Sequence, residues 1–284
     1  MPKRIALVTD STCDIPKAWR KKHEITVLPL TIIFGEEQLL DGVDISAEAF
    51  YERLMTDKHH PTTSQPSPKD FTEIFEKVKD AGADEILCIT ISSAMSGTMA
   101  SALGAAKDFS IPVRVMDSRN NSMGLGWQVI AAARAREDGG GMEEMISAAE
   151  EVREKMVFYI SLDTIEYLSK GGRIGDAVKW VDSVLQIKPM ITVKPDTGTV
   201  GIGMVSRSRK SGLKNLYKTF FKHLDTTKPM HIAVMHNNAL ADAEAVAAQI
   251  KGEFEPAELF IQIVSPILGV HTGPGPVALC GYSG

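Results

Sequence analysis

Short apolar runs alternate with helical stretches through the first half of the chain, and this alternation limits the fold more than any other feature. Ile5–Val8, Glu85–Ile91 and Val113–Met116 are apolar runs of strand length. The segment Ser67–Asp70 supplies an N-cap, an early proline and a first-turn acid, which predicts the start of a helix. This β-α-β-α order favours a parallel sheet covered by helices on both faces.

The order of elements changes after the glycine run Gly139–Gly141. Ile187–Val193 and Thr199–Val205 flank Pro195–Gly198, and this arrangement is typical of a β-hairpin. Two further strands, Ile232–Met235 and Leu259–Val264, are predicted on either side of an alanine-rich helix. Another predicted helix, with an apolar stripe from Leu213 to Leu224, precedes them. A mixed sheet with helices on one side fits this half of the chain.

Length and composition suit two folded domains. The chain has 284 residues, of which 44% are hydrophobic and 24% are charged. We therefore expect an α/β protein of two domains. Residues 1–150 would form an N-terminal three-layer α/β/α parallel-sheet domain, and residues 151–284 a C-terminal two-layer α/β domain with a mixed sheet.

Charge and cysteine content exclude several classes of protein. The net charge of −5 disfavours general nucleic-acid binding. Cys13, Cys88 and Cys280 are widely spaced and form no C-x-x-C motif, which favours a reducing compartment over a disulfide framework. We find no signal-peptide segment at the start and no apolar run of membrane-spanning length. We therefore expect a cytoplasmic protein.

Three segments are dense in hydroxyl groups, glycine and proline, and they are predicted to be loops. They are residues 61–67, 92–98 and 271–275. The carboxyl ends of parallel strands share one edge, where ligands usually bind, so we expect the second segment to lie there. Such loops suggest a neutral ligand site lined by hydroxyls, without a metal or an acid pair.

Motifs of several enzyme classes are missing. The sequence has no Walker A motif, no G-x-S-x-G elbow and no H-E-x-x-H. The segment Asp10–Thr12 could organise the neighbouring loops or supply a magnesium ligand. We favour the structural role, because no second acid clusters with it.

Several motifs, taken together and in order, resemble the DegV family of bacterial fatty-acid-binding proteins. They span nearly the whole chain: Thr9–Thr12, Val27–Leu30, Asp41-Gly42, Thr63–Pro68, Ser93–Thr98, Tyr167–Ile174 and His271–Gly275. The resemblance implies a two-domain α/β fold with a long-chain fatty acid, such as palmitate, buried between the domains. It implies no cofactor.

The same resemblance implies a partner. Some family members serve as the acyl-carrying subunit of a fatty acid kinase and present the carboxylate to a separate ATP-binding subunit. The chain would then be a non-catalytic lipid-binding protein that serves acyl-phosphate formation or lipid transport. Arg173 becomes a candidate for contacting the kinase or a phosphate, although the glycines before it could simply end a helix.

The resemblance assigns the carboxylate to Thr63, Ser96 and His271. Hydroxyl donors can hold a carboxylate without a full countercharge, and a histidine can donate to it. The two hydroxyls could instead cap helices or close turns, and the histidine could be structural.

Three more residues are candidate contacts in the same site. Ser93 lies beside Ser96, and Gly97 would let backbone N–H groups approach at a helix start. Arg207 resembles a family arginine near the histidine, and its alternative is an ordinary surface arginine.

The acyl tail needs a dry apolar tunnel, for which Val157–Leu162, Ile187–Ile191 and Ile267–Val270 are candidates. Plain core packing is the alternative for any one of these residues. Two other functions stay open. The chain could be an acyl hydrolase or transferase that uses Ser96 or Ser93 with His271. It could also be a small-molecule sensor on the same scaffold.

Overall fold

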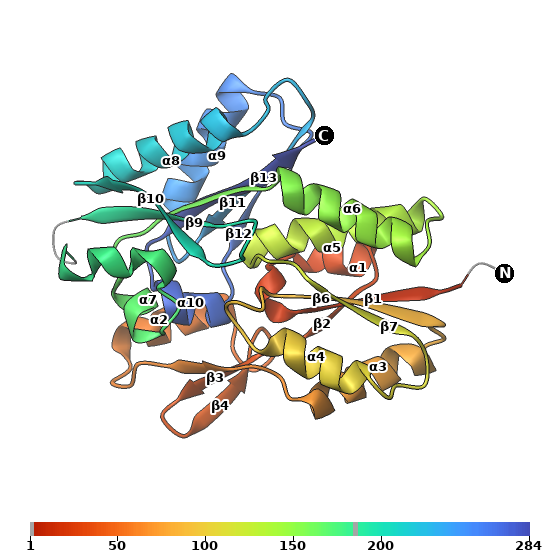
Figure 1. Ribbon diagram of the computed structural model, residues 1–284. Helices are drawn as coiled ribbons and strands as arrows, with labels where there is room; N and C mark the ends of the chain where they lie inside the picture. The colour runs from red at the N-terminus through yellow and green to blue at the C-terminus, as the bar shows by residue number, and fades with distance from the viewer. Residues whose placement is uncertain (1–2, 184–186) are drawn as a thin grey trace.

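The first half of the chain is built on a parallel sheet. A computed structural model describes residues 3–183 and 187–284 (Figure 1). Four strands lie in the order β2-β1-β6-β7, and every neighbouring pair is parallel, as the β-α-β-α alternation predicts. Their bounds are Ile5–Asp10 (β1), Ile25–Leu28 (β2), Glu85–Thr90 (β6) and Val113–Asp117 (β7).

Helices cover both faces of this sheet. On one face, α3 (Pro68–Asp80) and α4 (Thr98–Ala106) bury apolar side chains against the strands. On the other face lie α1 (Lys17–Lys22) and α5 (Ser122–Glu137), and α6 (Met142–Lys155) packs on α5 (Figure 1). The three-layer prediction for this half is therefore confirmed.

Local sequence determines where α3 begins. The Ser67 hydroxyl accepts a hydrogen bond from the backbone N–H of Asp70, and the Asp70 carboxylate accepts one from the N–H of Ser67. This capping box, with Pro68 at the first position, confirms the predicted helix start.

A small antiparallel sheet of three strands contradicts one prediction. Its strands are β3 (Thr31–Phe34), β4 (Glu37–Leu40) and β5 (Thr62–Ser64), in the order β4-β3-β5, and α2 (Ala47–Thr56) lies between β4 and β5 in the chain. The segment 61–67 was expected to be a loop, yet Thr63 pairs with Ile32 as part of an antiparallel strand. Three polar residues carry no alternating pattern, so only the pairing with β3 makes them a strand.

The second half contains a six-stranded mixed sheet in the order β10-β9-β8-β13-β11-β12. Strands β9 and β10 form the predicted antiparallel hairpin. Helices α8 (Arg209–His223) and α9 (Leu240–Glu253) pack on the outer face. The strands are Val157–Ser161 (β8), Lys188–Val193 (β9), Val200–Ser206 (β10), Met230–His236 (β11), Glu258–Ile263 (β12) and Val277–Ser283 (β13).

Three short helical segments lie beside the inner face of this sheet. They are α7 (Glu166–Lys170), the 3-10 segment η2 (Gly175–Ser183) and α10 (Pro266–Thr272). The segment 271–275 was expected to be a loop, but His271 occupies the last turn of α10. Pro266 at the first position and tight packing against α2 stabilise this short helix, whose sequence alone is a weak helix former.

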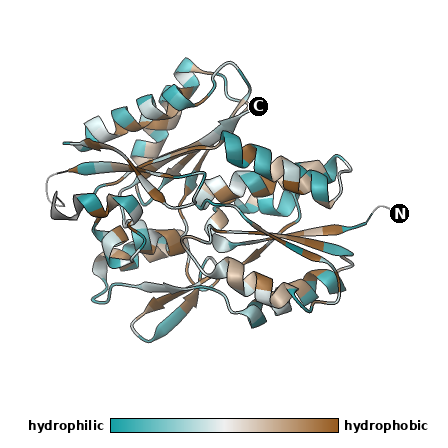
Figure 2. Ribbon diagram, in the orientation of Figure 1, coloured by the Kyte–Doolittle hydropathy of each residue, from teal (hydrophilic) through white to brown (hydrophobic). Residues whose placement is uncertain are grey.

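Helix α5 lies between the two large sheets and joins their cores. All of its residues from Ser122 to Ala133 are buried. One continuous apolar cluster contains Leu7 of the first sheet, Trp127 of α5 and Ala278 of the second sheet. Figure 2 shows hydrophobic colour along the central strands, while hydrophobic and hydrophilic residues alternate along most helices. The division near residue 150 stays a prediction.

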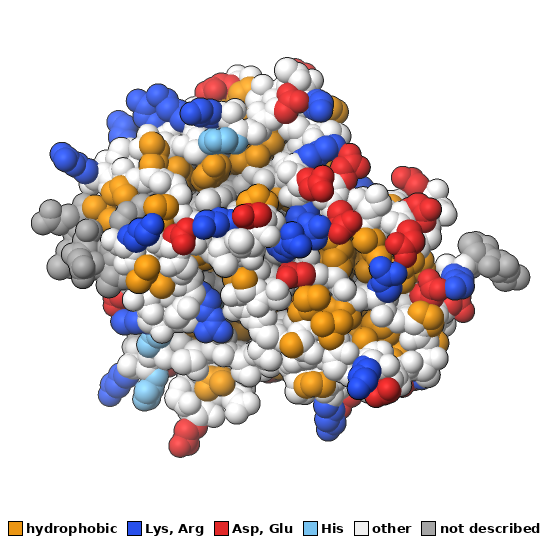
Figure 3. All heavy atoms as spheres, in the orientation of Figure 1, with side chains coloured by type: hydrophobic (Ala, Val, Ile, Leu, Met, Phe, Trp, Pro, Cys, Tyr) orange, Lys and Arg blue, Asp and Glu red, His pale blue; other side chains and the backbone are white. Residues whose placement is uncertain are grey.

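On the face that Figure 3 shows, acidic and basic side chains are interspersed with apolar ones. Figure 3 shows Lys and Arg side chains over α8, whose lysines at 210, 214, 218 and 222 repeat every four residues. In residues 3–183 and 187–284, no helix has both the length and the apolar character needed to cross a bilayer.

Candidate functional site

Two residues that are 208 positions apart meet where the halves of the molecule join. Thr63 on β5 and His271 on α10 lie with Oγ1 and Nε2 3.0 Å apart, in a half-buried position. Strand β5 pairs with β3, and α10 packs against both of these strands, so the contact depends on the tertiary fold. The structure thus brings together two of the three residues expected at the carboxylate.

The His271 ring is held in a tight, largely desolvated position. Its Nδ1 atom is buried and has no hydrogen-bond partner within the described part of the chain. A Cβ at Gly171 would lie 2.1 Å from that nitrogen, so only glycine leaves room for the ring. Burial, and to a smaller extent the cation of Arg173, lowers the pKa of His271 to about 4. The imidazole is therefore neutral near pH 7.

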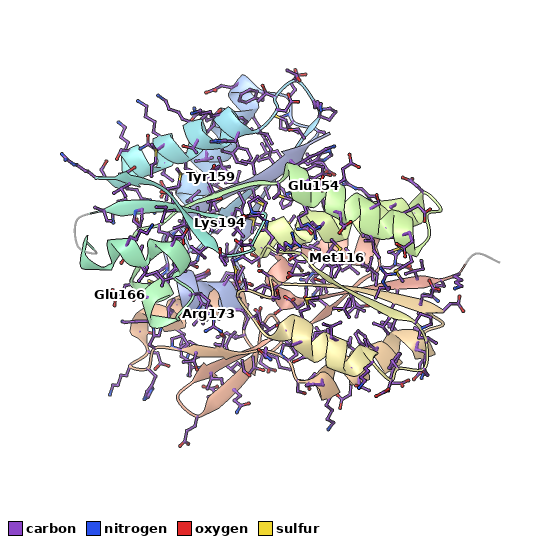
Figure 4. All side chains as sticks on the ribbon, in the orientation of Figure 1. Met116, Glu154, Tyr159, Glu166, Arg173 and Lys194 are labelled. Atoms are coloured by element: carbon purple, nitrogen blue, oxygen red, sulfur yellow. The ribbon has the colours of Figure 1, made fainter. Side chains whose placement is uncertain are left out.

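Arg173 provides the positive charge beside this ring. Its Nε donates to the carbonyl oxygen of Met95 at 3.2 Å, and its Nη1 donates to the carbonyl oxygen of Gly171 at 2.8 Å. Figure 4 labels Arg173 close to α7 and α10. The guanidinium thus joins the loop after β6 to the segment after α7, at one end of a cavity.

This cavity lies between the inner face of the second sheet, helix α10 and the start of α5. About 610 Å³ of space lies between its side chains, a figure that includes open solvent at its mouth. Most of the wall is apolar, and the candidate segments Val157–Leu162, Ile187–Ile191 and Ile267–Val270 all contribute to it. The lining residues are Met95, Asn121, Ser122, Phe158, Ile160, Leu168, Arg173, Ile191, Val193, Val200, Met235, Asn237, Val264, Leu268, His271, Thr272 and Ala278.

Ser96 and Gly97 lie at the start of α4, next to Met95. The Ser96 hydroxyl lies 2.8 Å from Oγ1 of Thr98 and accepts from the Thr98 backbone N–H at 3.3 Å. The Ser96 hydroxyl therefore closes a turn, which was the alternative to its contacting the carboxylate. Gly97 is the N-cap residue of α4, and a Cβ there would lie 2.3 Å from the side-chain oxygen of Gln65. Thr63, Ser96 and Gly97 are not lining residues of the cavity, although Ser96 follows the lining residue Met95 in the chain.

Ser93 and Arg207 lie outside the cavity wall. The Ser93 hydroxyl donates to Asp117 Oδ2 at 2.5 Å, and its side chain is exposed. Arg207 is exposed just after β10. Neither is a lining residue of the cavity. Their assignment to the carboxylate stays a prediction.

Asn121, Asn237 and Thr272 line the cavity. The sequence pointed to Thr272 only as part of the segment 271–275, and it did not identify either asparagine. Asn237 follows β11 directly and donates through Nδ2 to Thr272 Oγ1 and to the carbonyl oxygen of Gly273, both at 2.8 Å. Asn121 lies just after β7, at the edge where the parallel strands end. A polar residue directly after a strand could have identified Asn237, and a position between a parallel strand and the next helix could have identified Asn121.

Asp10 organises the loops at this edge. Its Oδ1 accepts from the N–H and hydroxyl of Thr12 at 3.0 and 2.5 Å, and its Oδ2 accepts from the N–H of Ile91 at 2.7 Å. The side chain is fully buried. These contacts support the structural role over the magnesium ligand. In the described residues, no three His, Cys, Asp or Glu side chains gather in a metal-binding group.

Comparisons with known proteins identify relatives along the full chain. Residues 4–283 match the model of the DegV family, described as a family of uncharacterised proteins. A DegV domain-containing protein of Clostridium acetobutylicum is 36% identical over 285 residues, with 98% of each chain covered. One from Streptomyces coelicolor is 34% identical over 277 residues, with 97% of each chain covered.

Solved structures share the fold. A DegV family protein from Thermus thermophilus, described with its fatty-acid binding, has a TM-score of 0.92, 30% identity and 99% coverage of both chains. The fatty-acid-binding protein DegV of Bacillus subtilis has a TM-score of 0.91 and 27% identity, over 99% of this chain and 100% of the other. A stearic-acid-binding protein from Eubacterium ventriosum has a TM-score of 0.86 and 26% identity, over 98% of both chains.

Proposed function

The chain belongs to the DegV family, and from that premise we propose that it binds one long-chain fatty acid between its two halves. The observation that carries the proposal is a largely apolar cavity with Arg173 and His271 in its wall. An acyl tail gains free energy by leaving water for such a wall, and a carboxylate needs hydrogen-bond donors. Structural relatives described as binding fatty acids support the same conclusion.

We place the carboxylate at Thr63, Ser96 and His271. The neutral imidazole and the two hydroxyls are donors without charge, so they can hold the carboxylate without neutralising it. Arg173 already donates to two backbone carbonyls, which directs part of its guanidinium away from the ligand. A carboxylate held in this way keeps an oxygen that can act as a nucleophile.

This chemistry fits presentation of the acid to a kinase subunit. The partner would supply the nucleotide and its metal, and a carboxylate oxygen would attack the terminal phosphorus, with nucleoside diphosphate leaving. Arg173, which is exposed at one end of the cavity, would face the incoming phosphate. Storage or transport of the acid, palmitate among the candidates, needs only the binding step.

An acyl hydrolase or transferase is less well supported by the geometry. A catalytic histidine is normally oriented by a third group, and Nδ1 of His271 has no hydrogen-bond partner within the described chain. The hydroxyl of Ser96 contacts Thr98, and that of Ser93 contacts Asp117. Incubation with an activated acyl ester separates the two functions, because only an enzyme of this type forms an acyl-serine adduct.

Denaturing extraction followed by mass spectrometry tests the proposal. Protein purified from a bacterial host should release about one fatty acid per chain, and delipidated protein should take up palmitate again. Protein that yields no fatty acid and cannot be loaded with one contradicts the proposed function.

A further inference from the structure

A second cleft lies at the edge of the parallel sheet opposite the loop that carries Met95. Its volume is about 470 Å³, within the usual range for small-molecule sites. The amino ends of β1 and β2 and the last turns of α1, α3 and α5 contribute to its wall. Strand β1 has six residues, so about 20 Å separate the two edges of the sheet. The cleft is therefore distinct from the proposed fatty acid site.

Cations dominate the wall of this cleft, although the whole chain has a net charge of −5. Among the described residues, Glu24 is the only acid in the wall. Six cationic side chains line it, which are Lys3, Arg4, Arg20, Lys21, Lys77 and Arg136. A concave site lined by charges of one sign attracts ligands of the opposite sign.

Two of the six cations have acidic neighbours. Lys3 forms an ion pair with Glu85, and Arg20 also lines a second pocket whose wall contains Asp14 and Asp41. The other four form no ion pair with any acid in residues 3–183 and 187–284, and they are Arg4, Lys21, Lys77 and Arg136. These four charges are available to a ligand.

Backbone carbonyls hold the two arginines of this group in place. Arg4 Nη1 donates to the carbonyl oxygen of Ala81 at 2.6 Å, just after α3. Arg136 donates to the carbonyl oxygens of Ile5 at 3.1 Å and His23 at 2.6 Å. A guanidinium has five N–H groups, so each arginine keeps further donors for a ligand. Their positive charges are thus fixed in position before any ligand binds.

Cations in the last turn of a helix also offset the helix dipole, which is the structural alternative for this cluster. Each helix end carries about half an elementary charge, so three ends account for fewer than two of the four cations. Glu24 accounts for one more. Acids that neighbour the wall have partners of their own, which are Lys3 for Glu85, His23 for Glu137 and the backbone N–H of Arg4 for Asp84. A surplus of positive charge therefore remains in the wall.

We propose that this cleft binds a small anion that carries two or more linked phosphate groups. Arginine binds phosphate oxygens through paired N–H groups, and lysine binds them as a point charge. The four available cations come from four segments around a cleft much larger than one phosphate ion, which favours a chain of phosphates over a single one. This inference goes beyond the proposed function and does not depend on it.

Isothermal titration calorimetry on the full chain at low salt tests this inference. The probes are inorganic triphosphate, adenosine triphosphate and inorganic phosphate. We expect one triphosphate per chain, bound at least tenfold more tightly than phosphate, with an affinity that falls as salt is added. Equal binding of the two triphosphates supports recognition of the phosphates alone, and tighter binding of the nucleotide supports an added contact with the nucleoside.

Two variants assign the binding to the cleft. Lys21 and Lys77 are exposed, and their side chains donate no hydrogen bond to a described residue, so Lys21→Gln and Lys77→Gln should keep the fold. Each should bind triphosphate about fivefold more weakly. Lys222→Gln removes the same charge from the last turn of α8, outside the cleft, and should bind like the wild type.

Three results overturn the inference: no saturable binding of triphosphate by the wild type, wild-type affinity in both cleft variants, or an equal loss in Lys222→Gln. Retention of fatty acid, measured on the same proteins, should not change in any of the three variants. The proposed function therefore stands or falls separately from this site.

Discussion

Gly171→Ala is the substitution that most directly tests how the His271 ring is positioned. Gly171 has an ordinary backbone φ of −79°, so alanine brings no backbone strain. Its Cβ would lie 2.1 Å from Nδ1 of His271, and the ring must retreat by about 1.3 Å to restore van der Waals contact. Nε2 of His271 now lies 3.0 Å from Oγ1 of Thr63. In most directions that the ring could move, this distance would increase beyond hydrogen-bonding range.

We expect this substitution to lower the free energy of unfolding by about 1–3 kcal/mol, the usual cost of overpacking. It should also reduce the fatty acid retained after purification. Urea unfolding should be measured on delipidated protein, because a bound ligand adds its own stability. Mass spectrometry then reports retention on the untreated protein.

Gly172→Ala is the matched control. Its φ is +69° and no atom lies within 4 Å of the new Cβ, so it costs about 1–2 kcal/mol through backbone strain alone. Retention of fatty acid should match the wild type. If Gly171→Ala retains as much fatty acid as Gly172→Ala, the ring is not held by this contact and the reasoning is wrong.

Three further substitutions test other contacts. Thr63→Val keeps the shape but removes the hydroxyl, and should weaken fatty acid binding about tenfold by equilibrium titration; unchanged affinity would remove Thr63 from the site. The folded pKa of His271 is about 4 against an ordinary 6.5. The unfolded chain therefore binds more protons between these values, and stability falls as the pH drops through them. His271→Asn should remove this pH dependence of the free energy of unfolding, which amounts to at most about 1.4 kcal/mol per pH unit. If urea unfolding gives the variant the same slope of free energy against pH as the wild type, the lowered pKa of His271 is contradicted. The Ser92 hydroxyl donates to the carbonyl oxygen of Gly198 at 2.8 Å. Ser92→Ala should cost about 1–2 kcal/mol in thermal or urea unfolding, and no loss would show that this contact is not stabilising.

The parallel sheet and its helices were predictable because their signals are local. Apolar runs of strand length mark β1, β6 and β7, and the capping box at Ser67 marks the start of α3. These signals depend on neighbours within a few residues. The hairpin of β9 and β10 was predictable for the same reason.

The two elements that carry Thr63 and His271 were assigned wrongly because tertiary packing forms them. Thr62–Ser64 becomes a strand through pairing with β3. The α10 sequence contains Gly269, a poor helix former, but a Cβ there would lie 2.6 Å from the Phe50 ring. Close packing against α2 therefore requires the glycine. The family resemblance suggested both site residues, yet their contact across 208 positions is visible only in the folded chain.

Burial of α5 between the two sheets has a consequence for motion and cooperativity. Separating the halves by a hinge would expose Trp127 and its aromatic neighbours Trp19, Phe260 and Tyr282, whose rings lie 5.5–5.8 Å from it. Each large aromatic buries roughly 150–250 Å², so such an opening would approach the free energy of global unfolding. If the proposed function holds, the ligand should exchange through local opening near the cavity. The whole chain should unfold in one cooperative transition.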